Sequence, residues 1–386
     1  MENFVYDIGT KIYFGKNQIN QLSTIIPCYG KRVLVVYGGG SIKRNGIYDS
    51  VCKQLDLSNS FYTELSGIGS NPKLSFVIEG RKICLQEKID VVLTVGGGSV
   101  IDCAKAIAAA VYYDGNPWDF VKNPGLIQEV LPIVTVLTIA ATGTEMDSIA
   151  VISNPDTDEK IGTRHPKMRP KASILDPTYT FSVSRYQTAA GVADILSHAM
   201  ETYFSGKEGY FQDRVAEAVM KTVIHYGPIV VKDPLNYEAR SNIMWASSWA
   251  INDFIKLGKM TGWSVHPIEH QLSAVYDITH GVGLAILTPH WMEHVLNSFT
   301  VDKFKELAIN VWNIEDDEDS FKVAKQGIEA LRNFYREIEL VYTLRDLGIY
   351  EEKHFLEMAK QAYKQVKDGY IPLSVNEIVE IYKESL

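Results

Sequence analysis

Residues 91–105 read VVLTVGGGSVIDCAK, which joins a short apolar run to three glycines and the start of a helix. The run at 91–95 is apolar on both faces of an extended chain. This is typical of a central strand in a parallel sheet that helices cover. Similar runs occur at 32–37 (RVLVVY) and 133–137 (IVTVL). Helical patterns lie near 42–57, 72–88 and 99–112. The alternation of strand and helix predicts a doubly wound α/β domain.

The second half of the chain has a different pattern. After Pro177 the strand-like runs stop, and eight helical patterns follow, the first near 184–205 and the last near 351–367. We therefore predict an α/β domain at 1–180 and an all-α domain at 181–386. The opening segment is expected to add short strands at a sheet edge. Its apolar residues are Phe4, Tyr6, Ile12 and Phe14.

Composition and charge narrow the function classes. The 386 residues are 46% hydrophobic, which excludes intrinsic disorder. The net charge of −9 argues against a nucleic-acid binder, and no apolar run is long enough for a transmembrane helix. The N-terminus lacks the features of a signal peptide, and the four cysteines are scattered without a CxxC pair. We expect a soluble cytoplasmic enzyme with no nucleic-acid and no membrane partner.

Two of the predicted strands end in the same glycine turn, GGGS at 38–41 and GGGS at 96–99. Glycines let the backbone approach an anion, and the N-terminus of the following helix offers free N–H groups and a positive dipole end. This chemistry suits a pyrophosphate, although neither turn matches GxGxxG. The alternative is a tight turn that binds nothing. The candidate cofactor-binding residues here are Gly38, Gly39, Ser41, Gly97, Gly98 and Ser99.

A third turn follows the run at 133–137 and reads TIAATGTE at 138–145. Its small residues and three hydroxyls suit contacts with a phosphate or ribose, which makes Thr138 and Thr142 candidates. In a dinucleotide fold, an acid after the second strand binds the ribose 2′-hydroxyl and disfavours a 2′-phosphate. The first turn has no acid and is followed by Lys43 and Arg44, which favours NADP(H) over NAD(H). Alternatively, these two cations are ordinary solvated helix residues.

One aspartate and several histidines indicate a metal site. Asp194 and His198 are i and i+4, so their side chains share one face of a helix. His266 and His270 have the same spacing, and His280 follows them in the sequence. A carboxylate with imidazoles and no thiolate suits Fe²⁺ or Zn²⁺. The spacing leaves open whether His270 is a fourth imidazole ligand or a proton relay, and each histidine is alternatively an ordinary core residue.

With these motifs the chain resembles the iron-containing (group III) alcohol dehydrogenases, and within them the butanol dehydrogenase-like branch. The resemblance covers nearly the whole chain, and its long histidine motif is specific. The matching pieces are GGGSIKRNG at 38–46, GGGSVIDCAKAIA at 96–108, ATGTEMD at 141–147, LDP at 175–177, GVADILSHAMETY at 191–203 and HPIEHQLSAVYDITHGVGLAIL at 266–287. It implies a dehydroquinate-synthase-like architecture, with a dinucleotide-binding domain followed by a helical metal-binding and substrate domain.

The resemblance also implies residue roles. The implied ligands of Fe²⁺ or Zn²⁺ are Asp194, His198, His266 and His280. His270 is then the implied catalytic residue, a proton relay beside the metal. The positions at which family members contact the nicotinamide cofactor are Asn71, Gly97, Gly98, Ser99, Asp102, Thr138, Thr142, Lys160 and Tyr179.

The implied reaction is NAD(P)H-dependent interconversion of primary alcohols and aldehydes. In our hypothesis the metal polarises the carbonyl, the nicotinamide C4 delivers hydride to the carbonyl carbon, and the oxygen is protonated through water or His270. The alternatives are a glycerol or polyol dehydrogenase and a non-redox metal-dependent lyase on the same fold. The apolar N-terminal segment also predicts strand pairing across a dyad, and hence a homodimer.

Overall fold

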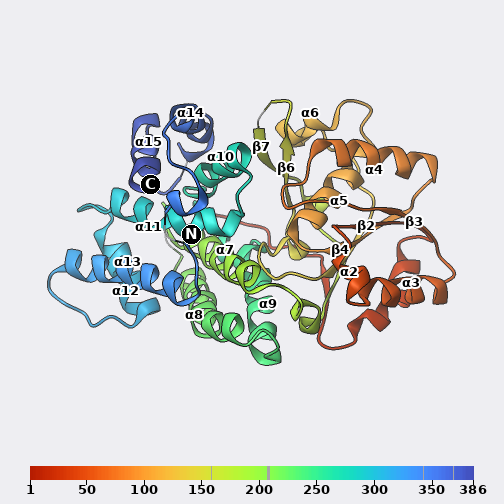
Figure 1. Ribbon diagram of the computed structural model, residues 1–386, viewed down its shortest axis with the longest axis horizontal. Coiled ribbons are helices and arrows are strands. Elements are labelled where there is room, and N and C mark those ends of the chain that lie inside the picture. The colour runs from red at the N-terminus through yellow and green to blue at the C-terminus, as the bar shows by residue number, and fades with distance from the viewer. Residues whose placement is uncertain (158, 207–208, 342, 368) are drawn as a thin grey trace. The chain divides into compact units, whose positions relative to one another are not determined.

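The computed structural model describes residues 1–157, 159–206, 209–341, 343–367 and 369–386 (Figure 1). The chain divides into two compact units. One unit is Asp7–Val183, and the other is Ser184–Leu386 together with Met1–Tyr6. The first unit contains a parallel sheet with helices and the second is helical, so the predicted fold class is confirmed.

A six-stranded parallel sheet forms the centre of the α/β unit, in the order β1-β8-β5-β4-β2-β3. Its strands are β1 (Lys11–Phe14), β2 (Arg32–Tyr37), β3 (Phe61–Leu65), β4 (Val91–Gly96), β5 (Ile133–Leu137) and β8 (Ala172–Leu175). The three runs read from the sequence are the neighbouring strands β2, β4 and β5. Every residue of β4 and β5 is buried, as expected for strands that helices cover on both faces.

Helices cover both faces of this sheet. Their bounds are α1 (Leu22–Ile25), α2 (Ser41–Arg44), α3 (Ile47–Leu57), α4 (Leu74–Gln86), α5 (Gly98–Ala110) and α6 (Pro117–Lys122). Leu34 and Val36 of β2 pack in one apolar cluster with residues of α4 and α5, whereas Val33 and Val35 pack in another with residues of α1 and α3. The two sets alternate because successive side chains of a strand point to opposite faces. Figure 1 shows α4 and α5 on one side of the strands and α3 on the other.

Several elements of this unit depart from the prediction. The strands β3 and β8 and the antiparallel hairpin of β6 (Ile149–Asn154) and β7 (Glu159–Arg164) were not predicted. β6 alternates half-buried and buried residues, so it lacks the continuous apolar run of a central strand. The helix predicted at 42–57 is interrupted because Gly46 has a φ of 77°, a left-handed conformation that does not continue a helix.

The opening segment is only partly as expected. Ile12 and Phe14 lie in the edge strand β1, but Phe4 and Tyr6 are not in a strand. The Glu2 N–H donates to the Gly258 carbonyl at 2.8 Å. The Tyr6 ring packs edge-on against Phe254, with 5.5 Å between centroids. These contacts place the first six residues in the helical unit, whereas the sequence analysis assigned them to the α/β domain.

The second unit is built from helices. Their bounds are α7 (Arg185–Tyr203), α8 (Tyr210–Lys232), α9 (Tyr237–Ile251), α10 (His266–Tyr276), α11 (His280–Val295), α12 (Val301–Trp312), α13 (Ser320–Glu337), α14 (Phe355–Val366) and α15 (Val375–Glu384). α7 is buried on all sides from Thr188 onwards, which marks it as the central helix. The sequence analysis missed α15, although it begins with a capping box of Ser374 and Glu377. Within the described residues, no helix is both long and apolar enough to cross a membrane.

Candidate functional site

The two glycine turns lie at the same edge of the sheet, because they follow the neighbouring parallel strands β2 and β4. Gly38 and Gly39 belong to the first turn, and Ser41 begins α2. Gly97 is the N-cap of α5, and Gly98 is its first residue. The first N–H groups of a helix have no acceptor within the helix, so this edge presents free backbone donors. Such an arrangement is compatible with an anionic group bound at the turns.

The third turn packs against the second. A Cβ on Gly98 would lie 2.4 Å from Thr142 Oγ1, and a Cβ on Gly97 would lie 3.1 Å from Ile139 Cβ. Real Cβ atoms do not approach another atom to 2.4 Å, so the contact with Thr142 by itself favours glycine at 98. Thr138 is buried at the end of β5. The sequence predicted these turns separately, and the fold brings them together.

The other predicted cofactor residues of this unit differ in their surroundings. Ser99 Oγ donates to the Ser70 carbonyl at 2.5 Å, which brings Asn71 close to the second turn. Tyr179 lies in the short helix η6 (Pro177–Thr180) and, with Asn45, Gly46, Ile47 and Ser50, lines a hollow of about 300 Å³. Burial raises the pKa of its phenol, so the hydroxyl stays neutral. Lys160 is buried in β7.

Asp102 takes part in a buried polar cluster. Its carboxylate accepts hydrogen bonds from Thr144 Oγ1 at 2.6 Å and from the Val151 N–H at 2.9 Å. The Lys105 ammonium is fully buried and donates to Thr144 Oγ1 at 2.6 Å and Asp147 Oδ1 at 2.5 Å. Burial raises the pKa of Asp102 to about 6, although Lys105 and Thr144 act in the opposite direction. These bonds tie α5 to the third turn and to β6.

Glu64, in β3, is a residue that the sequence analysis missed. The Tyr37 hydroxyl donates to Glu64 Oε2 at 2.6 Å, and the Tyr48 hydroxyl donates to Glu64 Oε1. Lys43 Nζ lies 3.4 Å from the same carboxylate, so its charge is partly balanced. The available signal was the position of Glu64 near the end of β3, the strand that pairs with β2. A dinucleotide fold carries its acid at the end of the second strand.

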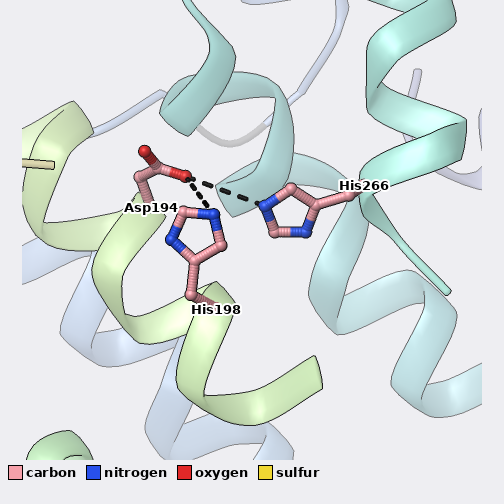
Figure 2. Close-up of side chains that lie close together, drawn as sticks. All are labelled: Asp194, His198 and His266. Carbon is pink, nitrogen blue, oxygen red and sulfur yellow. Dashed lines mark ion pairs between the residues drawn. The ribbon is translucent and has the colours of Figure 1, made fainter. Parts of the chain in front are cut away.

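In the helical unit, three imidazoles converge on one carboxylate oxygen. The Nε2 atoms of His198, His266 and His280 lie 3.7, 3.8 and 3.7 Å from Asp194 Oδ1. Figure 2 shows Asp194 with two of these rings. Asp194 and His198 lie one turn apart on α7, while His266 begins α10 and His280 begins α11. Tetrahedral ligands about 2.1 Å from an ion lie about 3.4 Å from one another, which is close to these three distances from Asp194 Oδ1. Asp194, His198 and His266 also offer ligand atoms that all lie within 4.8 Å of one another.

Two further carboxylates contact the opposite nitrogens of these rings. Glu201 Oε1 lies 2.9 Å from His266 Nδ1, and the Glu269 carboxylate is hydrogen-bonded to His280 Nδ1. Both glutamates are buried. Neither glutamate was predicted from the sequence. The signal for Glu201 was helical spacing, because it is at i+7 from Asp194 on the same helix.

The electrostatics of this group favour bound positive charge. Burial lowers the pKa of His198 to about 3, so its ring is neutral. Burial also disfavours the charged form of Asp194, but the neighbouring imidazoles outweigh it and hold the pKa of the carboxyl below its usual range. At His266 burial lowers the pKa, yet Asp194 and Glu201 together raise it to about 9. The carboxylates therefore attract a cation between the rings.

The donor atoms also fit a divalent cation. Asp194 Oδ1 and His266 Nε2 are buried, and neither has a hydrogen-bond partner within the described part of the chain. Buried polar atoms without partners are rare in folded proteins, and a metal ion between them would satisfy both. A set of three imidazoles and one carboxylate suits Fe²⁺ or Zn²⁺. The side chain of His280 is 24% exposed, so the group is open to solvent on that side.

His270 lies beside this group and not within it. Its ring centroid is 5.3 Å from that of His280 and 6.2 Å from that of His266. With Glu269 and His280 it forms a second set of potential ligand atoms, all within 4.8 Å of one another. This geometry does not decide between a proton relay and a further ligand, so the role expected for His270 stays a prediction.

Comparison with known families gives two matches that together span nearly the whole chain. The model of the iron-containing alcohol dehydrogenases matches residues 9–177. The model of the C-terminal part of the Fe-containing alcohol dehydrogenase family matches residues 188–386.

Similar proteins agree with these matches. The NADH-dependent butanol dehydrogenase A of Clostridium acetobutylicum is 53% identical over 390 residues, which cover 100% of both chains. The NADPH-dependent aldehyde reductase YqhD of Escherichia coli is 36% identical over 90% of both chains. Among solved structures, the NADH-dependent butanol dehydrogenase A of Thermotoga maritima has a TM-score of 0.94 and 37% identity, covering 100% of this chain and 99% of that one.

Proposed function

Because the chain belongs to the iron-containing alcohol dehydrogenase family, we propose that its helical unit holds the metal of this oxidoreductase and its α/β unit the nicotinamide cofactor. The enzyme is an alcohol dehydrogenase and aldehyde reductase. In the direction of reduction, hydride from the nicotinamide C4 and one proton convert an aldehyde into a primary alcohol and leave the oxidised cofactor. The proposed metal ligands are Asp194, His198, His266 and His280.

One observation carries this proposal: three imidazole Nε2 atoms lie within 3.8 Å of a single buried carboxylate oxygen. A bound Fe²⁺ or Zn²⁺ supplies Lewis acidity, which polarises the substrate oxygen. Asp194 and His266 are buried, whereas the group is open to solvent at His280, the side from which a substrate can enter. We propose that an imidazole nitrogen of His270 donates the proton that the substrate oxygen receives. His270 lies beside His280.

The proposed cofactor site uses the three turns at one edge of the sheet. Backbone N–H groups at the start of α5 would receive the pyrophosphate, and the hydroxyls of the third turn would contact phosphate or ribose. We propose that the hollow lined by Tyr179 receives part of the cofactor. The proposed contact residues are Gly38, Gly39, Ser41, Asn71, Gly97, Gly98, Ser99, Asp102, Thr138, Thr142, Lys160 and Tyr179.

For the cofactor preference we propose NADH, with NADP(H), which the first turn alone predicted, as the alternative. Ser41, Lys43 and Arg44 favour a 2′-phosphate, but the Glu64 carboxylate balances Lys43 and would repel that phosphate. The relative at 53% identity is named NADH-dependent, whereas the aldehyde reductase at 36% identity is named NADPH-dependent.

Glu64→Gln tests this preference. Removal of the negative charge releases Lys43, so kcat/KM for NADPH should rise relative to NADH by about tenfold, equivalent to roughly 1.4 kcal/mol. Steady-state kinetics with both cofactors measures the ratio. Glu79→Gln, a charge change on α4, is the control and should leave the ratio unchanged. An unchanged ratio in Glu64→Gln would exclude Glu64 as the determinant.

For the substrate we propose a short aliphatic aldehyde such as butanal, because the butanol dehydrogenases match the chain over its full length. The relatives are alcohol dehydrogenases and an aldehyde reductase, so neither a polyol dehydrogenase nor a lyase is favoured.

The direct experiment follows NADH and NADPH oxidation with butanal, on protein loaded anaerobically with Fe²⁺ or Zn²⁺ and on chelator-treated protein. Turnover should require the metal. Asp194→Ala should abolish both metal retention and turnover while circular dichroism stays unchanged. Full activity of the chelator-treated protein would contradict the proposal, as would normal metal content in Asp194→Ala.

A further inference from the structure

The three helices that carry the proposed ligands are linked in series by two buried carboxylates. α7 carries Asp194 and His198, and its Glu201 contacts His266, the first residue of α10. α10 in turn carries Glu269, which contacts His280, the first residue of α11. α7 and α10 therefore each supply both a ligand and the partner of the ligand on the next helix, and α11 supplies the last ligand.

From this geometry we infer that Glu201 and Glu269 are positioning residues that set the orientation and tautomer of His266 and His280 for metal binding, an inference that rests on the proposed function. An imidazole that donates its Nδ1 proton to a carboxylate presents an unprotonated Nε2, which is the form that binds a metal. In both rings Nδ1 is next to the glutamate, and Nε2 lies near Asp194 Oδ1.

Glu201 has a second task, because it also caps α10. Its carboxylate accepts hydrogen bonds from the Val265 and His266 N–H groups at 2.8 Å each, and from the Ser264 N–H. No side chain of the local sequence caps this helix. Both oxygens of Glu201 are thus used by N–H donors, and the acid also complements the positive end of the helix. Glu201 therefore ties the position of His266 to α7.

Glu269 is placed by packing. It is fully buried, and its other oxygen accepts a hydrogen bond from Ser273 Oγ. A Cβ on Gly283 would lie 2.8 Å from Glu269 Cγ, so the glycine in α11 leaves the space that Glu269 occupies. This explains one glycine of the HGVG stretch at 280–283 without reference to the metal itself.

His198 provides an internal contrast. Its Nδ1 is buried and has no hydrogen-bond partner among the residues that the structure describes. His198 needs no carboxylate because it shares α7 with Asp194, and the helix spacing already places it. His266 and His280 begin separate helices, so only tertiary contacts place their rings.

The test measures Co²⁺ affinity by competition with a chromophoric chelator, together with the visible spectrum of bound Co²⁺. Glu201→Gln should weaken binding by about 10–100-fold, because an amide offers one acceptor oxygen where two are needed. Glu269→Gln should have a smaller effect, since the Ser273 hydroxyl can turn to accept from the amide. Gly283→Ala should weaken binding by displacing Glu269. Each variant should also change the Co²⁺ spectrum.

The control is Glu217→Gln, a buried glutamate of α8 that bonds to Tyr203 and Arg214. It should lower stability and leave the Co²⁺ affinity and spectrum as in the wild type. Wild-type affinity and spectrum in both Glu201→Gln and Glu269→Gln would overturn the inference, as would equal loss in Glu217→Gln. If Glu201→Gln does not fold, the Co²⁺ affinities and spectra of Glu269→Gln and Gly283→Ala test the inference. Normal Co²⁺ binding in Asp194→Ala would instead refute the proposed ligand set.

Discussion

Gly98 illustrates how single residues constrain the proposed cofactor site. The nearest atom to a Cβ at this position would be Thr142 Oγ1, at 2.4 Å. The second and third turns approach as closely as they do because no side chain separates them. A residue that packing constrains, and that we propose also contacts the cofactor, tolerates little change.

Gly98→Ala should therefore destabilise the protein by about 1–3 kcal/mol, a typical effect of overpacking. It should also raise KM for the cofactor, because the turns must move apart. Denaturant unfolding and steady-state kinetics measure the two effects. Gly9→Ala is the control, since it lies outside the proposed contact residues and the nearest atom to a Cβ there would be Asp7 Oδ1, at 4.0 Å. A wild-type KM in Gly98→Ala would show that the turns do not bind the cofactor.

Asp102 predicts a pH dependence of stability. Burial raises its pKa to about 6 in the folded protein, above the usual value of 3.8. A raised folded-state pKa stabilises the protein at low pH, and this contribution is lost as pH rises through 6. Between about pH 5 and pH 7 the wild type should lose about 1 kcal/mol relative to Asp102→Asn. Urea unfolding of both proteins at each pH measures the difference. A constant difference would contradict the raised pKa.

At the scale of elements, the crossing of α7 and α11 depends on one glycine. A Cβ on Gly281 would lie 2.0 Å from the Ala190 carbonyl oxygen. The neighbour is backbone of α7, so it cannot move aside as a flexible side chain would. The close approach brings His280, at the start of α11, near Asp194 on α7.

Gly281→Ala should push α11 away from α7 and thereby weaken metal binding. Overpacking should lower the free energy of unfolding by about 1–3 kcal/mol, and the loss of metal affinity should be the larger effect. Metal content after dialysis and thermal unfolding measure the two effects. Gly206→Ala is the matched control, because among the described residues a Cβ there would have one neighbour, at 3.9 Å. Full metal content in Gly281→Ala would mean that this contact does not position His280.

At the scale of the whole molecule, the two units should respond to different ligands. The metal should protect the helical unit from hydrogen exchange, and NADH should protect the α/β unit. A ligand stabilises the structure that binds it by about 2.7 kcal/mol when the free ligand concentration is one hundred times Kd. Hydrogen exchange read by mass spectrometry resolves this by segment. Metal should slow exchange in α7, α10 and α11, and NADH should slow it in α5. Metal protection confined to α5 would contradict the assignment.

Oligomeric state belongs to the same scale. The homodimer expected from the N-terminal segment stays a prediction, and sedimentation equilibrium measures it. β1 is an edge strand of four residues that pairs with β8. Among the described residues no second strand pairs with it, so its outer edge is where a partner strand would pair.

Local pattern determined much of this protein. The runs that became β2, β4 and β5 were predictable because continuous apolar stretches between helical patterns have few other solutions. The pairing of Asp194 with His198 was predictable because helix geometry places i and i+4 on one face. β3 and β8 were missed, and so was α15, since short elements at the periphery carry weak periodicity.

Tertiary structure alone decided the rest. The histidine motif was specific enough to suggest ligands, but no spacing could bring His266 and His280 to within 4 Å of Asp194. Their convergence depends on how α10 and α11 pack against α7, and on Glu201, Glu269, Gly281 and Gly283. Glu64 enters the proposed cofactor site only because β3 pairs with β2. Sequence determines what neighbours along a helix or strand can do, whereas contacts between distant segments depend on packing, which local periodicity does not encode.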